Sequence, residues 1–164
     1  MQAASGSVEK RCRRERDVEE CEEVYRGVEK DETYLAYKYH APGSWYAYVI
    51  VLTSDRHLLL YRMRDDLLKP KERIKHVVIN EEGAELLRKK MMAVKTIEDF
   101  WSLFEELKGE IGYCDGLKTI GDLWKRFEEL KKGIGSEKKG GICVEFDYIL
   151  VHPYDIFDEY LLRY

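Results

Sequence analysis

Residues 33–79 constrain the fold more than any other part of this 164-residue chain, because they are patterned as strands joined by tight turns. Pro42-Gly43 and a Ser-Asp-Arg triplet at residues 54–56 interrupt the apolar runs, and such residues are typical of β-turns. Four segments have the length and composition of strands: residues 33–40, 45–53, 57–63 and 74–79. The pattern predicts an antiparallel β-meander over residues 33–79.

Helical patterns follow the meander. Asn80 stands where an N-cap is expected, acidic residues fill the first turn, and Lys89 and Lys90 occupy the last turn of a helix that reaches Met92. This charge placement suits the dipole of a helix. We expect helices over residues 81–132.

A late strand and a short helix are expected after these helices. Alternating residues at 142–151 predict the strand, which follows a Gly- and Lys-rich loop at 133–141, and a terminal helix is expected to complete residues 142–164. The predicted fold class is α+β: a meander of about four to five strands, counting the late strand, packed against helices in a single domain over residues 1–164.

The helical part contains an internal duplication. Lys95–Gly112 and Lys118–Gly135 align without gaps at a period of 23 residues, and 12 of 18 positions are identical. Each copy starts with a Thr that can cap a helix and carries one apolar stripe. We expect both stripes, with Trp101 and Trp124, to pack against the sheet. The alternative is that the two tryptophans face a partner.

The N-terminal segment, residues 8–30, is predicted to form a helix, because apolar residues in its second half recur at helical spacing. Five basic residues in its first half form a candidate nucleic-acid-binding arm: Lys10, Arg11, Arg13, Arg14 and Arg16. Four glutamates follow directly and cancel much of this charge. The alternative is therefore a solvated first part of a helix.

The four cysteines show no zinc-binding spacing. On one helix, Cys12 and Cys21 would lie about 13.5 Å apart, too far for a disulfide. A bridge would need a distant pair such as Cys114 with Cys143. Free buried thiols are the preferred expectation.

Composition narrows the functional classes. No apolar run approaches the roughly 20 residues of a membrane span, and the start of the chain does not resemble a signal peptide. The net charge of −4 argues against nucleic-acid binding by overall charge. Only Gln2 and Asn80 carry side-chain amides, which is typical of proteins from hyperthermophiles. We expect a soluble cytoplasmic protein of a thermophilic prokaryote or its mobile elements.

One pattern suggests catalysis. Glu145 and Asp147 stand two residues apart in the late strand, on one face, where two carboxylates can share a divalent metal. His152 and Asp155 follow at the end of that strand. These four residues support the hypothesis of a metal-dependent phosphodiesterase or nuclease. The alternative is that the two carboxylates are ordinary solvated residues of the strand.

The leading hypothesis is a non-enzymatic binding or regulatory protein that needs no cofactor and no metal. Its partner would be another protein or a second copy of the chain. The candidate partner-binding residues are aromatic: Trp101, Trp124, Tyr34, Tyr46 and Tyr48. A nucleic-acid-binding module that uses the basic arm is a second alternative to the phosphodiesterase.

Overall fold

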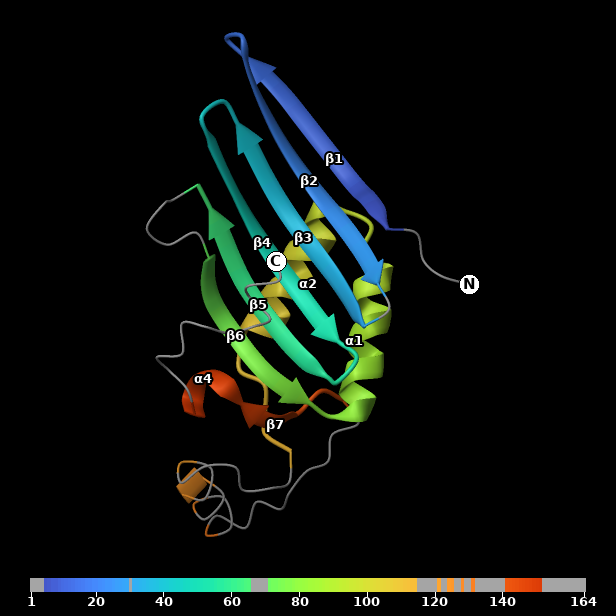
Figure 1. The fold of residues 1–164 in the computed structure, drawn as a ribbon, viewed down its shortest axis with the longest axis vertical. Helices are drawn as coiled ribbons and strands as arrows, with labels where there is room; N and C mark the ends of the chain where they lie inside the picture. Colours follow the sequence, from blue (N-terminus) through green and yellow to red (C-terminus); the bar gives the residue numbers. More distant parts are fainter. Residues whose placement is uncertain are drawn as a thin grey trace.

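The computed structural model describes residues 5–29, 31–65, 71–114 and 141–151, together with residues 121, 124, 125, 128 and 131. A seven-stranded antiparallel sheet forms most of this structure, with the strands in sequence order from β1 to β7 (Figure 1). The strands are β1 (Gly6–Glu15), β2 (Val18–Glu29), β3 (Glu32–Ala41), β4 (Ser44–Thr53), β5 (His57–Arg64), β6 (Lys71–Ile79) and β7 (Val144–Asp147). Strands β3 to β6 match the four predicted strands, so the meander and the α+β class are confirmed. The sheet has more strands than the four to five expected.

Two helices, α1 (Glu81–Ala93) and α2 (Ile97–Lys108), cover one face of the sheet (Figure 1). Helix α2 begins with a complete capping box, in which Thr96 and Asp99 satisfy each other's backbone N–H groups. Asn80 precedes α1 as predicted, but its side chain does not cap the helix. Instead its amide donates to Gly141 O and its carbonyl oxygen accepts from Cys143 N, so Asn80 ties α1 to the start of β7.

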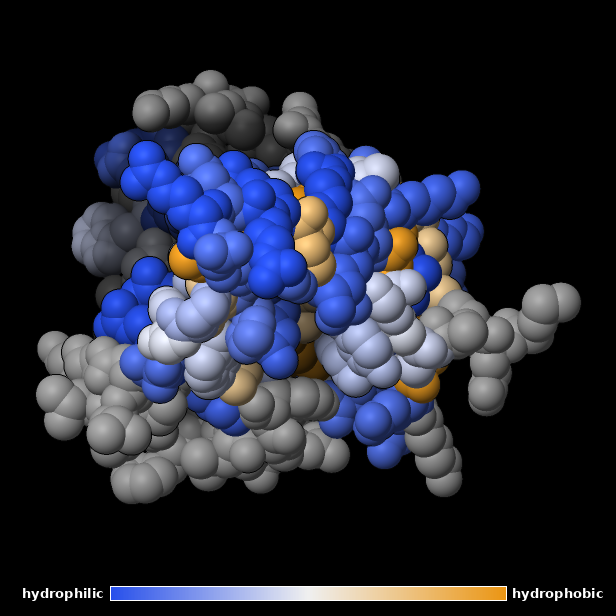
Figure 2. Space-filling view, turned by 90° about the horizontal axis from the view of Figure 1, so that it is seen from above, coloured by the Kyte–Doolittle hydropathy of each residue, from blue (hydrophilic) through white to orange (hydrophobic). Residues whose placement is uncertain are grey.

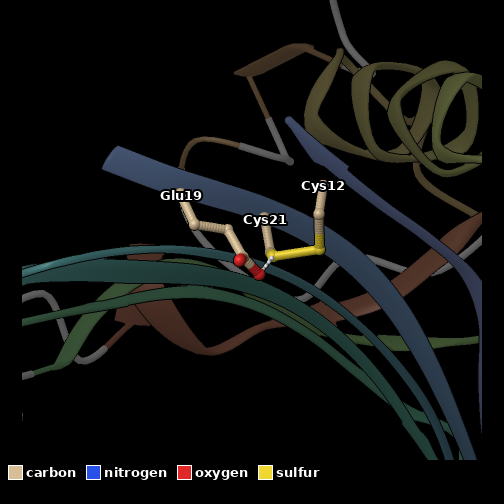
Figure 3. A group of neighbouring side chains, drawn as sticks. All are labelled: Cys12, Glu19 and Cys21. Atoms are coloured by element: carbon tan, nitrogen blue, oxygen red, sulfur yellow. Dashed lines mark hydrogen bonds between the residues drawn. A yellow bond between two sulfur atoms is a disulfide. The ribbon is translucent and has the colours of Figure 1, made fainter. Parts of the chain in front are cut away.

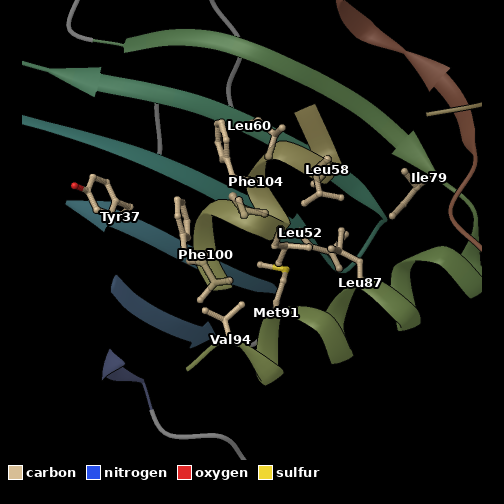
Figure 4. Close-up of a cluster of buried hydrophobic side chains, with 14 of the residues drawn as sticks. Tyr37, Leu52, Leu58, Leu60, Ile79, Leu87, Met91, Val94, Phe100 and Phe104 are labelled. Atoms are coloured by element: carbon tan, nitrogen blue, oxygen red, sulfur yellow. The ribbon is translucent and has the colours of Figure 1, made fainter. Parts of the chain in front are cut away.

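The core lies between the helices and the sheet (Figure 4). Apolar residues from β2 to β6 meet one stripe from each helix, and the largest fully buried members include Leu35, Ile50, Leu52, Leu58, Leu60, Ile79, Leu87, Met91, Phe100 and Phe104. A second buried cluster of Val49, Val51, Leu59 and Tyr61 lies on the opposite face, which α1 and α2 do not cover.

Two cations from the sheet stabilise the C-terminal ends of the helices. Arg26 of β2 donates to Met91 O and Val94 O at the end of α1. Lys75 of β6 donates to Leu107 O at 2.5 Å and to Gly109 O at 2.6 Å at the end of α2. Cations are favourable at these positions because the terminal carbonyl groups lack helical partners.

The prediction of a helix over residues 8–30 is wrong, because these residues form the β1–β2 hairpin. Arg16 and Asp17 turn the chain with φ values of 51° and 64°, the left-handed conformation that two-residue hairpin turns require. The apolar residues of β2 fit a helical stripe as well as a strand. Pairing with β1 and β3 therefore decides their structure.

The expectations about cysteines also need correction. Cys12 and Cys21 face each other across the hairpin with their Cα atoms 4.1 Å apart and form a disulfide. The separation of about 13.5 Å between Cys12 and Cys21 holds only if both residues lie on one helix. A second disulfide joins Cys114 to Cys143, the distant pair considered above, so the preferred expectation of free thiols is wrong.

Two further elements differ in part from the prediction. The late strand is shorter than expected, since β7 ends at Asp147 and a one-turn helix, α4 (Tyr148–Val151), follows. The predicted terminal helix lies outside the described residues. Most of the second copy of the duplicated unit lies outside them as well. Trp101 is half-buried, whereas Trp124 is 62% exposed, so the expectation that both tryptophans are core residues is wrong for Trp124.

The two tryptophans should therefore differ in their contribution to stability. Trp101 packs against Tyr37 and Tyr48, with ring centroids 4.8 and 5.1 Å apart. Trp101→Ala should lower the free energy of unfolding by roughly 2–4 kcal/mol, because it leaves a partly buried gap. Trp124→Ala should change it by less than about 0.5 kcal/mol, as surface substitutions usually do. Paired thermal melts measure both effects, and equal losses would contradict this interpretation.

Tyr37 should make stability depend on alkaline pH. Burial raises the pKa of Tyr37, and so does the hydrogen bond of 2.6 Å that its hydroxyl donates to Glu22. Its contribution is full below the unfolded-state pKa of about 10 and is lost as pH rises above it, because the unfolded chain then ionises first. Urea unfolding at pH about 8 and about 10.5 should show a smaller alkaline loss for Tyr37→Phe than for the wild type. The same loss in both proteins would remove Tyr37 as the cause.

Candidate functional site

The β1–β2 hairpin carries opposite charges on its two strands. Its register pairs basic residues of β1 with acidic residues of β2: Lys10 with Glu23, Arg11 with Glu22, Arg13 with Glu20 and Arg14 with Glu19. The disulfide lies at the centre of this ladder. Cross-strand pairs of opposite charge stabilise antiparallel strands, so this charge pattern favours the observed register.

Only part of this basic charge is used in ion pairs. Arg13 Nη2 lies 3.2 Å from Glu20 Oε2, and Arg11 Nη2 lies 2.6 Å from Glu9 Oε1 and 2.5 Å from Glu98 Oε2 in α2. Lys10, Arg14 and Arg16 form no ion pair with any residue in the described part of the chain. The hairpin therefore presents three cations to solvent.

Strand β1 forms an edge of the sheet. Within the described residues no strand pairs with its outer side, and Lys10–Glu15 are all exposed. The hairpin also projects beyond both helices (Figure 1). An edge strand presents backbone N–H and C=O groups that can pair with another chain, and charged side chains normally protect it from pairing indiscriminately. We regard β1 as the candidate binding edge.

The predicted tyrosine site is divided between two faces of the sheet. Tyr46 and Tyr48 lie on the helix side, where Tyr46 stacks on Tyr39 with centroids 4.9 Å apart and Tyr48 contacts Trp101 at 5.1 Å. Tyr34 lies on the opposite face, and its ring covers Gly27 so closely that a Cβ there would be 2.0 Å away. The structure therefore brings together Tyr46, Tyr48 and Trp101, and it separates Tyr34 from them.

Two of the scattered histidines converge. His57 Nδ1 lies 2.8 Å from His76 Nε2, and His57 Nε2 lies 3.5 Å from the Asp55 carboxylate. Tyr148 stacks on the His76 ring with centroids 4.1 Å apart. Both histidines are buried, and a neutral ring of one can donate to the ring of the other. The arrangement joins β5, β6 and α4, and the spacing of the histidines in the sequence did not reveal it.

The two carboxylates of the phosphodiesterase hypothesis have different neighbours. Glu145 Oε1 lies 3.2 Å from Arg56 Nη1, whereas the charge of Asp147 acts on Lys75. Burial lowers the pKa of Lys75, and Asp147 opposes this effect. His152 and Asp155 lie outside the described residues. The shared metal site of this hypothesis stays a prediction.

Apolar surface is scattered in the described part of the chain. Its exposed large hydrophobic residues are Val18, Tyr25, Leu86 and Trp124, which belong to β2, α1 and the segment after Tyr113. Figure 2, which views the molecule from above Figure 1, shows a mostly hydrophilic surface with isolated apolar side chains. None of the helices among the described residues is long and apolar enough to cross a membrane. This end of the described structure therefore presents mainly polar groups to solvent.

A mirror pattern in the sequence could have revealed the hairpin. Each cross-strand pair from Lys10–Glu23 to Arg14–Glu19 has residue numbers that add up to 33, and so does the pair Cys12–Cys21. Basic residues therefore meet acidic ones, and cysteine meets cysteine, when the chain folds back at Arg16-Asp17. If the same residues formed a helix, these mirror-related residues would not face each other.

Comparison of the chain with protein-family models, with curated proteins and with solved structures found no match in any of the three.

Proposed function

We propose that this protein is a non-enzymatic binding protein that takes an extended acidic segment of a partner protein as an additional strand along β1. The observation that carries the proposal is the combination, on one edge strand, of an open backbone edge and unpaired basic side chains. Backbone hydrogen bonds would supply affinity, and the charges would select the partner.

The hairpin itself supports an acidic partner. Strand β2 already pairs with the inner side of β1 through a run of glutamates, so the charge pattern of β1 is known to fit an acidic antiparallel strand. Lys10 and Arg14 have no ion-pair partner among the described residues, and they leave positive charge for a second acidic strand. The disulfide joins β1 to β2 and thereby lowers the free-energy cost of ordering β1 when a partner binds.

The same charges disfavour a second copy of the chain as the partner. In the antiparallel pairing that is centred on β1 (Gly6–Glu15), Lys10 of one copy would face Arg11 of the other. Like charges directly opposite each other destabilise a strand pair. Nucleic acid is disfavoured for another reason, because it has no peptide backbone to pair with the open N–H and C=O groups of the β1 edge.

A direct test uses the protein's own acidic strand as the probe. A fluorescent peptide with the sequence of residues 18–24, with Ser in place of Cys21, should bind the oxidised protein in low salt. Lys10→Gln/Arg14→Gln should weaken binding by roughly tenfold, since two favourable cross-strand charge pairs are lost. Fluorescence anisotropy measures the affinity, and hydrogen exchange should show slower exchange of β1 amides in the complex.

Matched controls separate the site from overall charge. Lys89→Gln/Lys108→Gln changes the net charge equally, on the helices, and should leave the affinity unchanged. A peptide with N-methylated backbone amides should fail to bind. Equal weakening by both double variants, retained binding of the N-methylated peptide, or tighter binding of a single-stranded oligonucleotide would each overturn strand addition.

A further inference from the structure

The hairpin disulfide lies within a group of side chains of the types that can bind a metal ion. Cys12 and Cys21 form the bridge, and Glu19 Oε1 lies 3.4 Å from Cys21 Sγ (Figure 3). The two sulfur atoms and a carboxylate oxygen all lie within 4.8 Å of one another. This is the one such group of three ligand atoms in the part of the chain that the structure describes. A thiolate pair with a carboxylate is a donor set that binds Zn²⁺.

A fourth donor stands beside this group. His40 of β3 is the cross-strand partner of Cys21, so Cys12, Cys21 and His40 form one row across three strands. Cross-strand partners share a face of the sheet, about 4.5–5.5 Å apart. His40 is exposed and forms no hydrogen bond or ion pair with the described residues, so its ring can turn toward the sulfur atoms.

We propose that reduction of the Cys12–Cys21 disulfide converts this group into a Zn²⁺ site with Cys12, Cys21, Glu19 and His40 as ligands. Two sulfurs, one imidazole nitrogen and one carboxylate oxygen complete a tetrahedral set. The inference does not rest on the proposed function, because it uses a different set of atoms and a different redox state.

The chemistry balances with a thiol or phosphine reductant. A dithiol donates two electrons and two protons to the S–S bond, which breaks to give two thiols, and the dithiol becomes a cyclic disulfide. Binding of Zn²⁺ then displaces the two thiol protons to solvent, since the thiolate is the ligand. In the oxidised protein both sulfurs are bonded to each other and no thiolate exists.

The backbone need not rearrange for this change. Two thiolates bound at about 2.3 Å to a tetrahedral zinc lie about 3.8 Å apart. The Cα atoms of Cys12 and Cys21 are 4.1 Å apart, and rotation about the side-chain bonds can separate the sulfurs while the strands stay paired. The second disulfide, Cys114–Cys143, has no comparable third ligand among the described residues.

Zinc titration of the full-length protein tests the proposal. The reduced protein, prepared with a phosphine that becomes its oxide by taking oxygen from water, should bind one Zn²⁺ against a competing chromophoric chelator. The oxidised protein should bind none. With Co²⁺ as the probe, the reduced protein should show the intense ligand-field bands of tetrahedral cobalt and thiolate charge-transfer absorption.

Single-residue variants show which side chains bind Zn²⁺. Glu19→Gln and His40→Ala should each weaken Zn²⁺ binding by at least about tenfold, as the loss of a metal-positioning group does. Glu23 is the matched control, because it stands two residues after Cys21 just as Glu19 stands two residues before it, yet among the described residues it forms no hydrogen bond with sulfur. Glu23→Gln should therefore bind Zn²⁺ like the wild type. The proposal fails if the reduced wild type binds no Zn²⁺. It also fails if Glu19→Gln and His40→Ala bind as tightly as Glu23→Gln.

Discussion

The burial of one sheet face under α1 and α2 is the interaction on which the rest of the structure depends. Phe100 and Phe104 of α2 and Leu87 and Met91 of α1 are fully buried against β3 to β6 (Figure 4). A sheet with an uncovered apolar face is unstable in water, so the strands depend on these contacts where α1 and α2 cover them. Where a strand extends beyond the helices, other interactions must stabilise it. Arg26 and Lys75 contribute by holding the C-terminal ends of the helices against the strands.

The helices leave the end of the β1–β2 hairpin outside the core, and other interactions replace hydrophobic burial there. Opposite charges align the two strands, and a disulfide joins them at the centre of the ladder. A two-stranded ribbon is only marginally stable in water without such support. The residues that stabilise the hairpin are also its exposed groups. For this reason the candidate binding edge and the inferred metal site both lie on it.

The sequence correctly predicted those parts of the fold in which the pattern of residues is compatible with a single type of secondary structure. The alternation and turns of residues 33–79 match only a meander, and Thr96 with Asp99 marks the start of α2. The helix predicted over residues 8–30 is wrong because Val18, Cys21 and Val24 recur every three residues, as on a helical stripe, whereas pairing with β1 and β3 makes this segment a strand. The convergence of His57 with His76 could not be predicted, because it depends on the register between β5 and β6, which the turn and strand patterns leave open.

The proposed binding edge and the inferred zinc site share strands β1 and β2. A disulfide and a bound Zn²⁺ are alternative cross-links between Cys12 and Cys21, and either one keeps β1 in register with β2. A reduced hairpin without metal loses the cross-link between its strands, and near Cys12 and Cys21 it depends on cross-strand charges and backbone hydrogen bonds, each worth about 1 kcal/mol or less. Its edge strand would then be less ordered before a peptide binds. Since ordering an interface costs free energy, the oxidised and zinc-loaded proteins should bind an acidic strand more tightly than the reduced protein without metal.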